Sequence, residues 1–165
     1  MGEEATGPGD GSGPVRRVRA DAQRNIVALL KAAAAVFRHE VDACADAAPA
    51  LAAEHEPVEA LACWMQRYAT FIATKRGLAA ALHSGDPAFD ALPVYFEQRV
   101  LPALRSLLGA AATGGMVRTD VEPLDLLRAV GNLCLPAHEH GPDHARRMVA
   151  LLVDGLRYGA ASSPA

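Results

Sequence analysis

Apolar residues recur every three or four positions across the first third of this chain, which is the spacing of one face of an α-helix. The face is made of Ile26, Leu30, Ala33, Phe37, Val41, Cys44 and Ala48. Its phase is kept up to Pro49, and a proline opposes a helix because it lacks an N–H and clashes with the preceding turn. We therefore expect one continuous helix from about Asn25 to Ala48, capped by Asp21 or Asn25 and about 36 Å long.

The remainder of the chain repeats this helical spacing in shorter segments, which prolines and glycines separate. The expected helices cover residues 57–76, 78–83, 93–112, 122–135 and 143–156, the last reaching 158 at most before Gly159. Pro102 lies inside one of them and should kink or divide it, whereas Gly114 and Gly115 mark a break. Aromatic residues make up only 5% of the sequence, and no segment shows the alternation of a β-strand. The prediction is an all-α protein.

Charge is distributed unevenly, although the formal net charge of −3 provides no general attraction to nucleic acid. The candidate nucleic-acid contacts are Arg16, Arg17, Arg19 and Arg24. By themselves four arginines give weak, salt-sensitive attraction to phosphates that does not depend on base sequence. Residues 1–14, rich in glycine, proline and acids, and the tail 159–165 are expected to be disordered. Neither a signal peptide nor a membrane-spanning run is evident, so we expect a cytoplasmic protein with no membrane partner.

Reactive residues form no recognisable catalytic or cofactor-binding motif. The cysteines are widely spaced within apolar helical segments, so buried free thiols are expected at Cys44, Cys63 and Cys134. The densest group of potential metal ligands consists of His138, Glu139, His140 and His144. Its spacing matches no usual zinc motif, and a solvated loop between two helices is the favoured interpretation over a metal site. We expect no enzyme activity, no cofactor and no metal.

Three segments in order carry a family resemblance: WMQRYATFIATKRGLAAAL (64–82), GMVRTDVEPLDLLRAVGNL (115–133) and RRMVALLVDGLR (146–157). Together they resemble the C-terminal, ligand-sensing domain of TetR/AcrR-type transcriptional regulators, and specifically the SbtR-like group. The preceding segment, VRRVRADAQRNIVALLKAAAAVFR (15–38), resembles the basic arm and first helix of such a regulator. The resemblance covers about Val15 to Arg157.

One part of such a regulator is missing from this resemblance. In TetR-type proteins a helix-turn-helix lies between the first helix and the sensing body, and two helices with their turn need on the order of 20 residues or more. Here Phe37 runs directly into Arg38, His39 and Glu40, and the apolar stripe keeps its phase across the junction. We therefore interpret residues 15–48 as the remnant of a DNA-binding domain and residues 49–158 as the sensing and dimerisation domain.

The resemblance implies a homodimer formed through the last two long helices, here 122–135 and 143–156. Both helices are apolar on more than one side, as expected of a helix that packs on its own domain and on a partner, or of a fully buried helix. The predicted dimer contacts are Leu124, Leu127, Val130, Met148, Val149, Leu152 and Leu156.

The resemblance also implies a small-molecule pocket between the helices of the sensing body. The candidate lining residues are Trp64, Tyr68, Phe71, His83, Phe96, Arg99 and Asn132. They combine aromatic walls with a few polar groups, as a ligand cavity requires. Aromatic residues at helical spacing are equally consistent with an ordinary core.

Two functions follow from these observations. In the first, the chain is a TetR-family-like transcriptional regulator, a homodimeric sensor of a small apolar or amphipathic ligand, which binds DNA weakly or not at all unless the missing segment is restored. In the second, it is a ligand-binding or interaction module, a relic or a dominant-negative partner of a full-length repressor, without direct DNA binding. A deletion within an ordinary repressor gene would produce the same sequence.

Overall fold

The computed structural model describes residues 13–74, 87, 89–134 and 142–160. Every regular element in these ranges is an α-helix, which confirms the predicted fold class. The elements are α1 (Gly13–Glu54), α2 (Pro57–Thr74), α4 (Leu92–Thr113), α5 (Pro123–Leu133) and α7 (Pro142–Ala160). The helix expected at 78–83 and the end of the preceding one at 75–76 lie outside the described residues.

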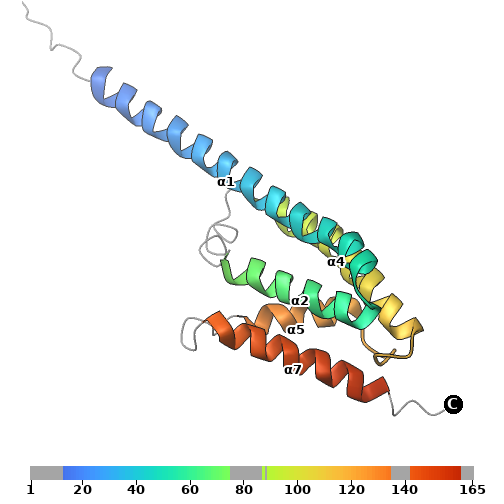
Figure 1. Ribbon diagram of the computed structural model, residues 1–165. Coiled ribbons are helices and arrows are strands. Elements are labelled where there is room, and N and C mark those ends of the chain that lie inside the picture. The colour runs from blue at the N-terminus through green and yellow to red at the C-terminus, as the bar shows by residue number, and fades with distance from the viewer. Residues whose placement is uncertain (1–12, 75–86, 88, 135–141, 161–165) are drawn as a thin grey trace, which may run out of the picture.

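Helix α1 is continuous over 42 residues, about 63 Å at 1.5 Å per residue, and includes the predicted segment 25–48. It begins earlier than expected, at Gly13, and the expected end at Pro49 is wrong because the helix continues to Glu54. Pro49 is exposed, so its ring lies on the solvent side of the helix and outside the packed core. Among the described side chains of α1, Ala34 is the first that is buried, and the part before it projects beyond the body (Figure 1).

Helix α2 is the centre of the body and is in contact with each of the other four described helices. The second half of α1 and helix α4 cover one side of it, and α5 and α7 lie on the other (Figure 1). The largest side chains of the core come from all five elements and from the segments beside them: Trp64, Phe89, Leu61, Met65, Leu92, Leu104, Leu126, Val41, Val100, Val117, Val130 and Val149. Helices α2 and α4 each contribute three of these residues, and α2 is the helix that contacts all the other described helices.

The ends of the later helices agree with the sequence in part. Helix α2 begins at Pro57 as expected, and α4 continues through Pro102 without being divided. The break after α4 is formed at Gly115, whose positive φ of 67° places it in the left-handed region that favours glycine. Gly159 does not end α7, which extends to Ala160.

Candidate ligand cavity and apolar groove

Aromatic side chains lie along one face of α2 and continue onto the neighbouring helices. Trp64, Tyr68 and Phe71 follow one another at helical spacing, with ring centroids 5.7 Å and 6.4 Å apart. The ring of Phe96 on α4 lies 6.1 Å from Tyr68 and 6.0 Å from Phe71. These distances are typical of interacting rings, so the four residues form one aromatic cluster between α2 and α4.

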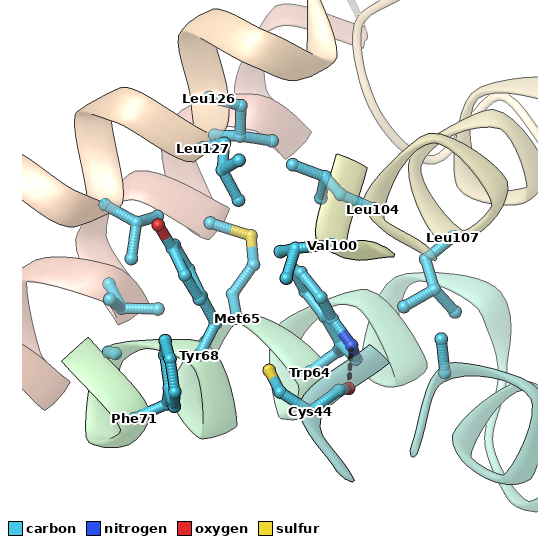
Figure 2. Close-up of a cluster of buried hydrophobic side chains, with 14 of the residues drawn as sticks. Cys44, Trp64, Met65, Tyr68, Phe71, Val100, Leu104, Leu107, Leu126 and Leu127 are labelled. Atoms are coloured by element: carbon cyan, nitrogen blue, oxygen red, sulfur yellow. Dashed lines mark hydrogen bonds between the residues drawn. The ribbon is translucent and has the colours of Figure 1, made fainter. Parts of the chain in front are cut away.

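Trp64 and Phe71, although predicted as pocket residues, lie in other surroundings. Trp64 is fully buried, and its Nε1 donates a hydrogen bond of 2.9 Å to the main-chain oxygen of Cys44 on α1 (Figure 2). Its one polar atom is therefore already satisfied by the protein. The ring of Phe71 packs against Phe37 of α1 at 5.8 Å, on the side of α2 that faces α1.

A cavity of about 500 Å³ lies where α2, α4 and α5 meet. It brings together three predicted pocket residues, Tyr68, Phe96 and Asn132. The other lining residues were not among those predicted: Pro93, Glu97, Leu124, Leu127, Arg128 and Gly131. Most of them are ordinary helix-face residues, and they face a common space only because α4 and α5 approach α2 at this point.

The hydroxyl of Tyr68 is the most deeply placed polar group of this cavity. Only 3% of the Tyr68 surface is exposed, and the described part of the chain offers its hydroxyl no hydrogen bond. Burial raises the pKa of this hydroxyl above that of an ordinary tyrosine, so the group keeps its proton at physiological pH. The hydroxyl borders the cavity and accepts or donates no hydrogen bond within the described residues, so it is available to a bound molecule with a hydrogen-bond acceptor.

Arg99, also predicted as a pocket residue, does not line the cavity. Its Nε donates to Asp42 at 2.7 Å and a terminal nitrogen donates to Asp46 at 2.8 Å, which joins α4 to α1. The hydroxyl of Tyr95 donates to the same Asp42 carboxylate at 2.7 Å. The hydrogen bond from Tyr95, followed by that from Arg99, lowers the pKa of Asp42. The remaining candidate, His83, lies outside the described residues.

A second concave surface lies between α5 and α7, with a volume of about 560 Å³. Its walls are mostly apolar and are formed by Arg118, Val121, Asp125, Leu126, Ala129, Leu133, Met148, Leu151, Leu152, Gly155 and Leu156. Leu151 is 65% exposed, which is unusual for a large apolar side chain at the centre of an apolar surface. We refer to this surface as the α5–α7 groove.

The predicted dimer contacts divide between this groove and the protein interior. Met148, Leu152 and Leu156 line the groove. Leu127, Val130 and Val149 are buried in the core of the single chain, with exposed fractions of 4%, 1% and 0%; Leu156, at 4%, is also buried, and Leu124 lines the ligand cavity. Side chains that are already buried have almost no surface left to cover.

The predicted nucleic-acid contacts lie on the part of α1 that projects beyond the other helices (Figure 1). Arg17, Arg19 and Arg24 are exposed, and the side chain of Arg16 is outside the described residues. Arg24 forms an ion pair with Asp21 one turn earlier. The exposed positive charge of this segment is therefore partly neutralised within the helix.

Metal-binding groups are not assembled by the described residues, which contain no cluster of three potential ligands. Residues 138–140 lie outside the described ranges. The three cysteines are free thiols, and burial raises the pKa of Cys44 to about 11. Among the described helices, none has the length and apolar character needed to span a bilayer.

Comparison with known proteins identifies the class and then the family. The chain has the structural class of a bacterial TetR-type regulator: the TetR transcriptional regulator SCO0520 from Streptomyces coelicolor is 34% identical, with a TM-score of 0.64 over 75% of this chain and 71% of that one. Residues 56–158 match the family described as transcriptional regulator SbtR-like, C-terminal domain, and the chain belongs to this family. The resemblance predicted from the sequence is thereby confirmed. No curated protein matches the chain.

Proposed function

We propose that the chain is the sensing domain of a TetR-family regulator and that it binds a small apolar or amphipathic molecule in the cavity between α2, α4 and α5. The observation that carries the proposal is Tyr68, a residue that is 3% exposed and whose hydroxyl, without a hydrogen bond from the described residues, lies at the wall of a cavity of about 500 Å³. Apolar walls with a few fixed polar groups are the usual composition of a small-molecule site, and the volume suits a molecule of drug size.

A fluorescent probe tests the position of this site. N-phenyl-1-naphthylamine, an uncharged dye that brightens in apolar surroundings, should bind the wild-type protein. Gly131→Leu, which places a large side chain in the cavity, should reduce binding at least tenfold, whereas Leu151→Ser in the α5–α7 groove should leave it unchanged. Circular dichroism establishes that both variants are folded. Equal binding by wild type and Gly131→Leu would refute the proposed site.

The second part of the proposal is a homodimer formed through the α5–α7 groove. It is supported by the exposed Leu151 and by the half-buried Met148 and Leu152, which would be covered by the same residues of a second copy. Leu151→Glu should shift the protein from dimer to monomer in analytical ultracentrifugation. Val94→Glu is the matched control, since Val94 is 59% exposed but lies on α4, outside the groove. Unchanged dimerisation of Leu151→Glu would contradict this interface.

The third part concerns DNA. Helix α1 continues through residues 37–40 without interruption, so the described segment 13–54 contains no helix-turn-helix. We propose that this chain does not bind an operator specifically and that it acts through its ligand and through pairing, either with itself or with a full-length relative. A mobility-shift assay on its own upstream region, at low and physiological salt, should show weak binding that disappears with salt. Specific retention at physiological salt would refute this part.

A further inference from the structure

The surroundings of Tyr68 restrict which molecules the proposed ligand cavity can accept, and the inference below rests on that proposed site. The side chain leaves α2 and its hydroxyl points toward α5 (Figure 2). A Cβ atom built on Gly131 of α5 would lie 3.8 Å from the hydroxyl oxygen. Both residues line the cavity. The absence of a side chain at Gly131 therefore leaves space beside the hydroxyl of Tyr68.

The hydroxyl can offer a proton but no negative charge. Burial raises its pKa, so the hydroxyl is not ionised to a phenolate at physiological pH. The sulfur atoms that contribute to this shift, those of Cys44 and Cys134, belong to free thiols and are buried as well. A cationic ligand would therefore find no counter-charge at the inner end of the cavity, and an anionic one would find only a neutral hydrogen bond.

The charged residues of the cavity favour neither a positively nor a negatively charged ligand. Glu97 and Arg128 lie among the lining residues, carry opposite charges and are exposed. Arg128 also lies 3.9 Å from Asp125 on its own helix. Exposed charges of opposite sign are screened by water, so their combined attraction for an ion inside the cavity is small.

We propose that the cavity selects an uncharged, mainly apolar molecule with a carbonyl or ether oxygen, and that Tyr68 donates a hydrogen bond to that oxygen. The face of the Phe96 ring and the apolar side chains of Leu124 and Leu127 would contact the apolar part of the molecule. Ring ketones, aryl esters and quinone-like compounds have this chemistry. Simple hydrocarbons lack the acceptor, and carboxylates carry a charge that would have to be desolvated.

Three isosteric probes test this selectivity: 2-acetylnaphthalene, 2-isopropenylnaphthalene and 2-naphthoate. They share a ring system and differ in presenting a carbonyl, a carbon–carbon double bond or a carboxylate. In calorimetric titrations the ketone should bind the wild-type protein about three- to tenfold more tightly than the alkene, the range expected of one net hydrogen bond. The naphthoate should bind more weakly than the ketone.

Tyr68→Phe removes the hydroxyl and keeps the ring, so it should abolish the preference for the ketone over the alkene. Tyr158→Phe is the matched control, because Tyr158 is 83% exposed on α7 and its hydroxyl is remote from the cavity lining. Gly131→Ala adds a methyl group at ordinary contact distance from the hydroxyl and should weaken all three probes. The proposal is supported if the preference for the ketone is lost in Tyr68→Phe and kept in Tyr158→Phe.

The possible failures are distinguishable from one another. If ketone and alkene bind the wild type equally, and Gly131→Ala weakens both, the ligand site stands and the hydrogen-bond inference is overturned. If the naphthoate binds most tightly, the selection of uncharged molecules is overturned. If no probe binds, or if Gly131→Ala has no effect on any of them, the cavity is not the binding site and both proposals fail.

Discussion

The two halves of α1 carry the same apolar helical stripe in different surroundings. In the first half Ile26 is 48% exposed and Leu29 is 68% exposed, although both are large apolar residues. In the second half the exposed fractions of Val41 and Cys44 are 0% and 2%. Helices α2 and α4 flank only the second half (Figure 1). The same helix is therefore a core element along part of its length and a projecting rod along the rest.

This difference shows that a helical pattern and a buried face are separate properties. A periodic stripe predicts where a helix forms and which side is apolar, but burial requires another element beside it. In proteins most of the stability of a helix comes from packing its apolar face on other elements, which the first half lacks. The first half is thus ordered through its covalent continuity with the anchored second half, and substitutions in the two halves should differ sharply in effect.

The largest difference is expected for a proline placed in each half. Ala45→Pro removes a main-chain hydrogen bond at a position that is 6% exposed and forces a ring into the packed core, so it should cost about 4 kcal/mol or more. Ala28→Pro, in the projecting half, should reduce the helical signal in circular dichroism without changing the free energy of unfolding of the body. Urea denaturation measures the free energy of unfolding of each variant. A similar loss of this free energy in the two variants would show that the two halves of α1 fold as one unit.

The next largest difference concerns apolar truncation. Phe37 is 5% exposed and packs against Phe71, so Phe37→Ala should destabilise the protein by about 3 kcal/mol. Leu29→Ala removes a side chain that is mostly in water and should change the free energy of unfolding by less than about 0.5 kcal/mol. A large cost at Leu29 would indicate that a partner covers this face in solution.

A smaller effect is expected at the polar contact between α1 and α4. Asp42→Asn weakens the hydrogen bonds from Tyr95 and Arg99, and because these groups are partly exposed the cost at neutral pH should be about 1 kcal/mol. The folded state lowers the pKa of Asp42, so its contribution is complete above the ordinary aspartate pKa and is lost as the pH falls through the lowered value. The Tm should therefore fall more steeply between neutral pH and pH 3 in the wild type than in Asp42→Asn. Parallel curves of Tm against pH would contradict this linkage.

The smallest effect is expected at the ion pair within the projecting half. Asp21 and Arg24 are both exposed and lie three residues apart on one helix, a geometry that contributes about 0.2–0.5 kcal/mol in isolated helices. Asp21→Asn should leave the unfolding of the body unchanged, while slightly increasing the salt-sensitive attraction of this segment to DNA, because a negative charge is removed beside the arginines. Weaker DNA attraction in Asp21→Asn would contradict this electrostatic account.

The sequence predicted the helices well because their limits depend on local chemistry. The start of α2 at Pro57 and the break at Gly115 follow from the restricted φ of proline and the left-handed freedom of glycine. The end of α1 was predicted wrongly at Pro49, because the helix continues to Glu54 with the exposed Pro49 inside it.

The candidate site was predictable only in part. Tyr68, Phe96 and Asn132 were chosen because they are aromatic or polar, and the structure places all three around one cavity. Trp64 was chosen for the same reason, yet its N–H is bonded to Cys44, from a helix 20 residues earlier in the chain. Gly131 offers no pattern in the sequence that marks a cavity wall. Its place beside the Tyr68 hydroxyl is visible only in the folded chain.

By itself, the sequence determined that this protein is helical, that one stripe continues through residues 37–40, and that the chain belongs to a regulator family. These properties depend on spacing and on neighbours a few residues away, which a linear pattern records. Only the tertiary structure decided that Leu127 and Val149 are core while Leu151 is exposed, and that Arg99 binds Asp42 instead of lining the cavity. Such choices depend on how helices cross, and the crossing is set by packing among side chains from distant parts of the chain.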